Sequence, residues 1–337
     1  MKNLITDVPG VLVGNAQDAR VATGATVAIF EGGAVASVAT LGGAPGSRSV
    51  SLLEPEMMRG QIDAVVLSGG SLFGLDAAGG ATSVLVADGR GGTFGGITLP
   101  VAVQAILFDL MNGGEKDWLK APMTHRPPYW ELGRDAARAA SDVFDLGTAG
   151  AGYGATTVTF KGGLGSASAR TSQGFTVGAL VAVNAVGSAT IGDGPHFWAG
   201  AYEQGNEFGG LGWPTKVPPS ALAPRFKGLP APATATTIAL VATDATLDKA
   251  ACKRLAIMAN DGLGRALRPA HAPNDGDTVF AASTGRAGPV SEPPALTELG
   301  ATAADCLARA IARGVYEAKA LPFPNALPDW KQRFAPS

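Results

Sequence analysis

The sequence predicts an α/β fold, in which buried strands alternate with helices. Short runs of β-branched and apolar residues end in glycine pairs, which is typical of strands followed by tight turns. Two long segments near the C-terminus place their apolar residues on one helical face instead. The 337 residues are 46% apolar and only 16% charged, so the chain can bury a large core, in one large domain or two small ones.

Strands dominate the first third of the chain, where apolar residues alternate or run continuously. They are predicted over 6–15, as a turn and a short strand, and over 24–30, 34–41 and 63–67. The last of these continues through a Gly-rich turn into a helix predicted over 76–86. That turn is not a nucleophile elbow, because Phe73 stands where the motif needs glycine, and no Gly-Lys-Ser/Thr follows to make a phosphate loop. We interpret it as scaffold.

Strands and helices share the rest of the chain. An apolar run covers 97–110, and strands are predicted over 156–160, 175–185 and 278–283. Helices are predicted over 130–144, 246–268 and 294–320, where apolar residues recur at helical spacing. A long irregular segment, 203–233, is rich in Gly and Pro and precedes a further strand that begins at Thr236.

Charge and cysteine content limit the expected partners and compartment. The net charge of −2 provides no electrostatic footprint for nucleic acid or for an acidic membrane. Cys252 and Cys306 are the only cysteines, which argues against a disulfide framework and fits a reducing compartment. No signal-peptide pattern opens the sequence, and no apolar stretch is long enough to span a bilayer. We therefore expect a cytoplasmic protein.

Thr236 stands where the irregular segment meets a buried strand that contains Ile238 and Leu240. If the chain were cut just before this residue, a new N-terminus would carry both a nucleophilic hydroxyl and a basic α-amine. The unperturbed pKa of such an amine, about 7.7–8.0, suits general-base work near neutral pH. Thr236 can equally be an ordinary β-branched residue at the start of a strand. The residues alone leave both interpretations open.

Four other polar residues lie at or next to the ends of predicted strands. Lys161 follows the strand at 156–160 and is flanked by glycines, so it can point into a cavity or simply be solvated. Asn184 lies at a strand end, where its amide can donate to an oxyanion or cap a turn. Asp275 and Asp277 flank a glycine before the next strand, and they can bracket a site or form an ordinary turn.

The usual constellations for hydrolysis are missing from the sequence. His125, His196 and His271 lack metal-ligand spacing, so we expect no metal and no cofactor. Both cysteines fall in predicted helices, and neither a Ser–His nor a Cys–His arrangement is indicated. These absences favour an N-terminal threonine as the nucleophile.

Seven segments, in this order along the chain, resemble the self-processing L-aminopeptidase/D-esterase family, which includes β-aminopeptidases and the 6-aminohexanoate-oligomer (nylon) hydrolases. Each segment is a weak signal, but together they span nearly the whole chain and are specific. They are Val-Pro-Gly-Val-Leu-Val-Gly (8–14), Gly-Gly-Ala-Pro-Gly-Ser-Arg (42–48), Leu-Ser-Gly-Gly-Ser-Leu-Phe-Gly-Leu-Asp (67–76), Phe-Lys-Gly-Gly-Leu-Gly-Ser-Ala (160–167), Val-Asn-Ala-Val-Gly (183–187), Thr-Thr-Ile-Ala-Leu-Val-Ala-Thr-Asp-Ala (236–245) and Asp-Gly-Asp-Thr-Val-Phe-Ala (275–281).

The resemblance implies a single domain over 1–337 with a four-layer αββα sandwich, in which helices cover two central sheets. It also implies autocleavage between Ala235 and Thr236 into an α fragment, 1–235, and a β fragment, 236–337. The fragments stay associated in this family, usually as a tetramer of αβ units. We therefore expect a homo-oligomer that binds neither nucleic acid nor membrane.

The same resemblance implies roles for the site residues. Thr236 becomes the nucleophile, and Asp275 and Asp277 match the acidic pair that orients it and its amine. Lys161 and Asn184 match positions that line the site, with Asn184 as the oxyanion donor.

Two residues depart from the family pattern. Ala235 precedes the expected cut, where other members have Asn or Gly; the related ornithine acetyltransferases, however, cut at Ala-Thr. Phe108 stands where some members place a tyrosine that donates to the oxyanion, so this substrate-binding position provides one donor fewer.

The expected function is amide-bond hydrolysis by an autocatalytically freed N-terminal threonine. The expected substrate is a peptide or oligoamide: N-terminal residues of peptides, amino-acid amides, or 6-aminohexanoate oligomers. Two alternatives remain at this point, an acyltransferase of the ornithine-acetyltransferase type and an unprocessed, non-catalytic relative. An acceptor-dependent rate would indicate the first, and an intact fold without cleavage would indicate the second.

Overall fold

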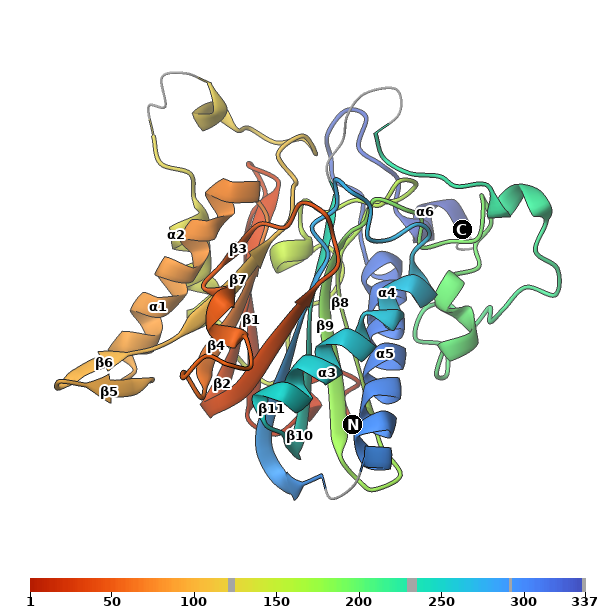
Figure 1. Ribbon diagram of the computed structural model, residues 1–337. Coiled ribbons are helices and arrows are strands. Elements are labelled where there is room, and N and C mark those ends of the chain that lie inside the picture. The colour runs from red at the N-terminus through yellow and green to blue at the C-terminus, as the bar shows by residue number, and fades with distance from the viewer. Residues whose placement is uncertain (121–124, 229–234, 291–292, 335–337) are drawn as a thin grey trace.

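The computed structural model describes residues 1–120, 125–228, 235–290 and 293–334 (Figure 1). Part of the irregular segment predicted over 203–233, namely 229–233, lies outside the described residues. The longer strands are β1 (Val11–Asp18), β2 (Thr23–Thr40), β4 (Ile62–Ser68), β7 (Ala102–Ile106), β8 (Leu164–Arg170), β9 (Thr176–Asn184), β10 (Thr236–Thr246) and β11 (Thr278–Pro289). The short strands are β3 (Ser47–Arg48), β5 (Gly92–Phe94) and β6 (Ile97–Leu99). The helices are α1 (Ala77–Ala87), α2 (Tyr129–Arg138), α3 (Lys249–Ala259), α4 (Asp261–Ala266), α5 (Pro293–Tyr316) and α6 (Trp330–Phe334).

Strand β2 connects two sheets, because it bends midway at Gly32 and Gly33, whose φ angles are +88° and +80°. Its first half pairs with β1 and β4, and its second half pairs with β11. We name the two sheets A and B: sheet A has the order β3-β7-β4-β2 with β1 also on β2, and sheet B has the order β2-β11-β10-β9-β8. The two strands predicted over 24–30 and 34–41 are thus one bent strand.

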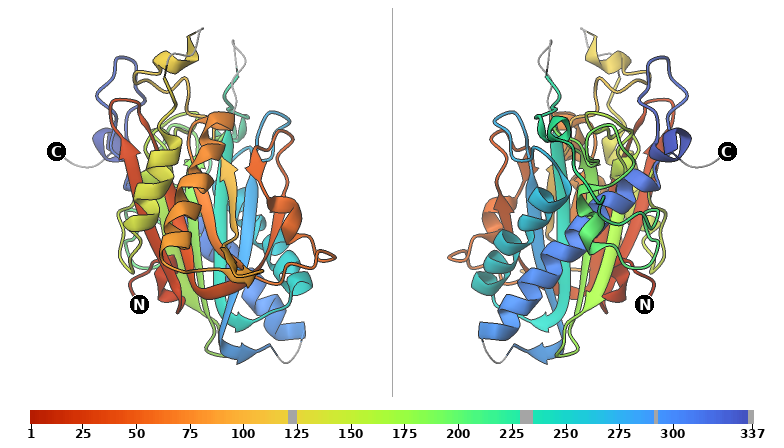
Figure 2. Two further views of the ribbon diagram at one scale, coloured as in Figure 1. Left: turned by 90° about the vertical axis from the view of Figure 1, so that its left-hand side faces the viewer. Right: turned by 90° about the vertical axis from the view of Figure 1, so that its right-hand side faces the viewer.

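Three hydrophobic cores separate four layers. Helices α1 and α2 cover the outer face of sheet A through residues such as Val66, Leu85 and Leu132. The two sheets pack face to face through residues such as Leu67 and Leu240. Helices α3, α4 and α5 cover the outer face of sheet B. The expected αββα sandwich is therefore confirmed, and Figure 2 shows it from its two helical sides.

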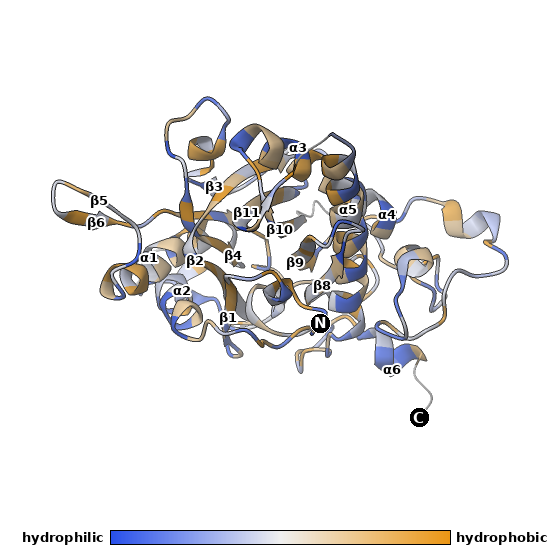
Figure 3. Cartoon of the chain, turned by 90° about the horizontal axis from the view of Figure 1, so that it is seen from below, coloured by the Kyte–Doolittle hydropathy of each residue, from blue (hydrophilic) through white to orange (hydrophobic). Residues whose placement is uncertain are grey.

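The pattern of hydropathy fits this layering. Seen from below in Figure 3, hydrophobic colour runs through the central strands, and hydrophilic bands appear on helices α2 and α5. Among the described residues, no helix combines the length and apolar character needed to cross a membrane.

Several predicted elements differ from the structure. The helix predicted over 246–268 is two helices, α3 and α4, and Asp248 caps α3 by accepting a hydrogen bond from the Ala251 N–H at 2.7 Å. The helix predicted over 130–144 ends at Arg138.

The strand predicted over 156–160 is wrong, since the next strand, β8, begins at Leu164. Gly163 and Gly165, in the Gly-rich stretch after Lys161, let β8 approach helix α5. A Cβ on Gly165 would lie 1.8 Å from the Ala310 carbonyl oxygen, and one on Gly163 would lie 2.3 Å from the Gly314 carbonyl oxygen.

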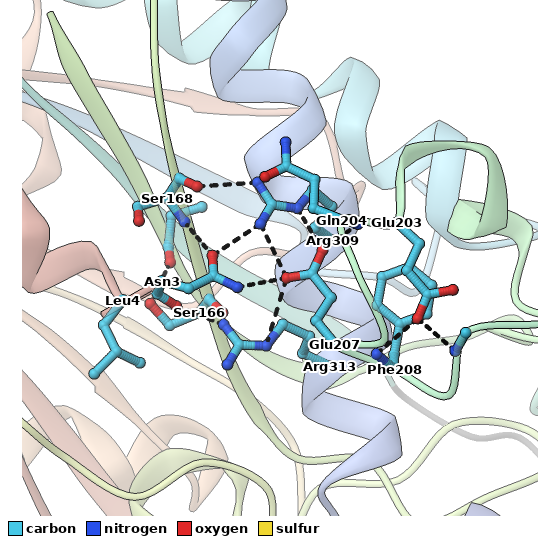
Figure 4. A network of polar contacts seen from close by, with 12 residues as sticks. Asn3, Leu4, Ser166, Ser168, Glu203, Gln204, Glu207, Phe208, Arg309 and Arg313 are labelled. Atoms are coloured by element: carbon cyan, nitrogen blue, oxygen red, sulfur yellow. Dashed lines mark hydrogen bonds and ion pairs between the residues drawn. The ribbon is translucent and has the colours of Figure 1, made fainter. Parts of the chain in front are cut away.

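A buried polar network joins the N-terminus, the segment after the 3-10 turn at Trp198–Tyr202, and helix α5 (Figure 4). Arg309, only 1% exposed, forms two hydrogen bonds of 2.6 and 2.9 Å with the Glu207 carboxylate. The same guanidinium donates to Asn3 Oδ1 at 2.8 Å and to the Ser168 carbonyl at 3.0 Å. Residues on both sides of the predicted cleavage point therefore share one buried network.

Candidate active site

Thr236 is the first residue of β10 and is only 4% exposed. It pairs directly with Asn184, the last residue of the antiparallel strand β9. Since alternate residues of a strand share a face, Thr236 lies on the face of Ile238 and Leu240, which pack between the two sheets. The predicted nucleophile and the predicted oxyanion donor are therefore neighbours at one end of the inter-sheet core.

The backbone around Thr236 brings its hydroxyl close to the preceding carbonyl. Thr236 Oγ1 donates to the Ala235 carbonyl oxygen, and the Gly276 N–H donates to the same oxygen at 3.2 Å. A Cβ on Gly276 would lie 2.7 Å from Thr236 Oγ1, so only glycine fits beside the hydroxyl without displacement. Gly276 thus contacts both the hydroxyl that would attack and the carbonyl that would be attacked.

Asp277 holds the backbone next to the predicted nucleophile. Its carboxylate is 1% exposed and accepts the Thr237 N–H at 2.7 Å and the His271 N–H at 3.0 Å, one on each oxygen. The His271 ring Nδ1 lies 2.9 Å from the second oxygen but outside hydrogen-bonding geometry. Asp277 therefore acts on the main chain that follows Thr236, which suits the orienting role expected for it.

Asp275 lies beside the predicted cleavage point, because it forms an isolated parallel bridge with Ala235. Its side chain is 1% exposed. Burial, together with the neighbouring charge of Asp277, raises the pKa of Asp275 to about 8. Asp275 therefore holds its proton more tightly than an exposed carboxyl group, and in that form it can donate a hydrogen bond as well as accept one.

The Gly-rich segment 42–46 packs on the turn that carries both aspartates. The N–H groups of Leu41 and Gly42 donate to the Asp277 carbonyl at 3.1 and 3.2 Å, and the Ala44 N–H donates to the Asp275 carbonyl at 2.7 Å. A Cβ on Gly42 would lie 2.3 Å from the Asp277 nitrogen, so glycine is required for this close approach. The segment holds the acidic turn in place.

Asn184 is fully buried and connects the two sheets. Its Oδ1 accepts the Thr156 N–H at 3.0 Å, and its Nδ2 donates to the Phe108 carbonyl at 2.9 Å. Because one partner is a donor and the other an acceptor, the orientation of the amide is fixed. Phe108, predicted to bind substrate, contacts Asn184 through its main chain, just beyond the end of β7.

Lys161 is buried, and its ammonium donates to three backbone carbonyls. The acceptors are those of Gly152, Ala155 and Gly162, at 2.9, 2.8 and 2.7 Å. Burial lowers the pKa of Lys161 to about 7, so a substantial share of the neutral amine is present at that pH. In its charged form Lys161 uses all three protons on the backbone, and it braces the segment 152–162 rather than touching Thr236.

Lys227, which the sequence analysis did not single out, belongs to this site. Its Nζ donates to the Thr156 carbonyl at 2.8 Å and to Asn184 Oδ1 at 3.2 Å, and its backbone N–H donates to the Val186 carbonyl at 2.9 Å. Burial lowers the pKa of Lys227 to about 7, while Asp275 opposes that shift. The available sequence signal was a lone basic residue in a Gly- and Pro-rich segment, close before the expected cut.

A further buried carboxyl group supports the turn after β4. Asp109 accepts the Thr23 hydroxyl at 2.6 Å and the Gly70 N–H at 2.8 Å. Burial raises the pKa of Asp109. The turn at 68–71 is held by these bonds, in line with its interpretation as scaffold.

Cavity size does not identify the site. A cavity of about 760 Å³, lined by Gly32, Arg59, Arg90 and neighbouring residues, contains none of the predicted catalytic residues. The site is identified by its chemistry instead. Thr236, Asn184, Asp275, Asp277 and Lys227 converge where β9, β10 and β11 meet.

Known proteins share both the sequence and the fold. The model of peptidase family S58 matches residues 3–326. An uncharacterized aminopeptidase of Mycobacterium tuberculosis is 38% identical to this chain, over 94% of this chain and 94% of its own length. An uncharacterized aminopeptidase of Mycobacterium leprae is 39% identical, over 95% of this chain and 91% of its own length.

Among solved structures, a β-aminopeptidase of a Burkholderia species has a TM-score of 0.67 at 22% identity and covers 98% of this chain and 91% of its own. The L-aminopeptidase D-Ala-esterase/amidase of Ochrobactrum anthropi, described as a variant of the Ntn-hydrolase fold, has a TM-score of 0.65 at 20% identity, covering 97% of this chain and 90% of its own. These likenesses establish the fold. The family match over nearly the whole chain shows that this protein belongs to peptidase family S58 and is an aminopeptidase-like hydrolase with the Ntn-hydrolase fold.

Proposed function

We propose that this protein is a self-processing amidohydrolase whose nucleophile is Thr236, freed as an N-terminus by cleavage after Ala235. The observation that supports this most strongly is the contact of Thr236 Oγ1 with the carbonyl of the residue before it, in a buried setting where Gly276 N–H holds the same carbonyl. An attacking hydroxyl and an oxyanion donor are the two groups that an acyl shift requires.

Maturation would proceed in two steps. The Thr236 hydroxyl attacks the Ala235 carbonyl carbon, the Gly276 N–H stabilises the oxyanion, and the C–N bond breaks as the Thr236 nitrogen takes a proton. The chain is then joined by an ester, which water hydrolyses to free the Thr236 hydroxyl and amine. Asp277, bonded to the Thr237 N–H, keeps the new N-terminus in the sheet.

Turnover would reuse the same nucleophile. The Thr236 amine accepts the hydroxyl proton as oxygen attacks the substrate amide carbon, and the Asn184 amide stabilises the tetrahedral oxyanion. Asp275 and Asp277 orient the amine and the main chain. Collapse expels the substrate amine, and water hydrolyses the acyl-enzyme.

The proposed substrates are N-terminal residues of peptides, amino-acid amides and 6-aminohexanoate oligomers. The Burkholderia and Ochrobactrum enzymes, whose names give β-aminopeptidase and L-aminopeptidase activity, support the first two classes. We further propose a cytoplasmic tetramer of αβ units; the two free, buried cysteines fit a reducing compartment.

The first test is intact-mass spectrometry of the purified protein under denaturing conditions. Two masses, with the shorter fragment beginning at Thr236, would support the proposal, and Thr236→Ala should give one full-length mass. The wild type is then assayed with L-alanine p-nitroanilide, β-alanine p-nitroanilide and the 6-aminohexanoate dimer. A single persistent mass in the wild type, or turnover by Thr236→Ala, would refute it.

A further inference from the structure

The position of Lys227 requires an explanation beyond that of a loop residue. Lys227 is half-buried, and its ammonium donates to two acceptors, the Thr156 carbonyl and the side-chain oxygen of the fully buried Asn184. A cation that loses part of its hydration in this way is costly unless its partners compensate for the loss. A surface lysine would avoid that cost, so the placement points to a function at Asn184.

We propose that Lys227 is a positioning residue that acts through Asn184, strengthening the Asn184 amide as the oxyanion donor during substrate turnover; this inference rests on the proposed function. The orientation of the amide is already fixed by the Thr156 N–H and the Phe108 carbonyl. In its protonated form, Lys227 therefore adds charge rather than direction. A cation on the oxygen of an amide withdraws electron density from its nitrogen, which makes the remaining N–H a stronger donor.

The segment that carries Lys227 is fixed independently of the scissile bond. The Lys227 backbone N–H bonds the Val186 carbonyl at 2.9 Å, two residues beyond Asn184. Cleavage after Ala235 leaves this bond and the two ammonium bonds intact, because all the partners belong to residues 1–235. Lys227 thus remains beside Asn184 in the mature protein.

Maturation and turnover should depend on Lys227 differently. In the uncleaved chain the Ala235 carbonyl accepts a backbone hydrogen bond from the Gly276 N–H. Gly276 lies just before β11, on the side of β10 opposite to Asn184. Autocleavage can therefore proceed with that donor, whereas the substrate oxyanion relies on Asn184. Removal of the Lys227 charge should slow turnover and spare cleavage.

The experiment compares Lys227→Met, which keeps much of the length but removes the charge, with Lys227→Arg, which keeps the charge. Fragment formation is followed by mass spectrometry, and kcat and KM are measured with whichever of the three substrates named above the wild type hydrolyses fastest. We expect Lys227→Met to form both fragments, to lose about tenfold in kcat, and to change KM less than threefold. Lys227→Arg should recover most of the kcat. In an Asn184→Ala background, Lys227→Met should cost less than it does alone.

Cleavage also reports that the variant has folded. If Lys227→Met forms no fragments, Lys227→Gln replaces it, because its amide can still donate to both acceptors without a charge. The inference is overturned if a cleaved neutral variant keeps the wild-type kcat, if neither neutral variant is cleaved, or if the losses at Lys227 and Asn184 add fully. A wild type that is not cleaved at all would instead refute the proposed function.

Discussion

Thr236 and Asn184 lie directly opposite each other across strands β10 and β9. In an antiparallel pair, opposite side chains share a face with Cβ atoms about 4.5–5.5 Å apart, which is within reach of a bound carbonyl between them. The register of two strands, rather than any flexible loop, thus sets the distance between the proposed nucleophile and the proposed oxyanion donor.

Asn184→Asp should lower kcat about 10²–10³-fold, because one oxyanion donor is replaced by an acceptor of the same shape. The Thr156 N–H and Lys227 keep an oxygen partner in this variant, so the structural change is confined to the Nδ2 side. Steady-state kinetics and fragment analysis measure the effect. Wild-type kcat in a cleaved Asn184→Asp protein would show that the amide is not the donor.

Gly276→Ala should block or strongly slow maturation, because the new Cβ would lie 2.7 Å from Thr236 Oγ1 and displace the hydroxyl. The matched control is Gly264→Ala in helix α4, where a Cβ meets nothing within 4 Å. The control should be cleaved at the wild-type rate. Time courses of fragment formation by mass spectrometry distinguish the two, and equal rates would contradict the proposed position of the hydroxyl.

Asp275 should make the uncleaved protein less stable as pH rises. Its pKa is about 8 in the folded protein against a reference value of 3.8, so between these values the folded state holds a proton that the unfolded state has lost. The stabilisation of the folded state by this proton is fully present below about pH 4 and is lost as the pH approaches 8. The free energy of unfolding falls by at most about 1.4 kcal/mol per pH unit in this range.

The pH effect is measured by urea unfolding at several pH values, with Thr236→Ala as the single-chain reference and Thr236→Ala/Asp275→Asn as the variant. The unfolding free energy of the reference minus that of the Asp275→Asn variant should decrease from pH 4 to pH 8 and then level off. A difference that does not vary with pH would show that Asp275 titrates normally in the fold.

Glu207→Gln should weaken the association of the two fragments. Glu207 would belong to the proposed α fragment and Arg309 to the proposed β fragment, and the change leaves a buried guanidinium without its carboxylate. Loss of one partner of a buried pair costs about 3–5 kcal/mol. The control is Glu54→Gln. Its partner Lys253 also lies on the other side of the proposed cleavage point, but this pair is more exposed: the Lys253 side chain is 29% exposed and the Glu54 side chain 38%.

Loss of a solvent-exposed ion pair costs about 0–1 kcal/mol, so the control should behave like the wild type. The measurement is the urea concentration at which fragments separate on size-exclusion chromatography. Equal midpoints for Glu207→Gln and Glu54→Gln would show that the network in Figure 4 does not hold the fragments together.

The sequence by itself determined the α/β class, most of the strands and the main candidate residues. Local patterns carry this information, because strand periodicity and the position of a residue at a strand end depend on near neighbours. Thr236 at the start of β10 and Asn184 at the end of β9 are therefore recognisable from the sequence alone. The order of seven short segments also led to the family, which the family comparison confirmed.

Only the tertiary structure decided which groups meet. Lys227 comes from an irregular segment, yet it contacts Asn184, 43 residues away, through a packing that no local pattern encodes. The glycines after Lys161 allow β8 to approach α5, a contact that depends on a helix far along the chain. Long-range packing also set the burial that raises the pKa of Asp275 and lowers that of Lys227. Charge states at this site are therefore a property of the fold, and its residue types are a property of the sequence.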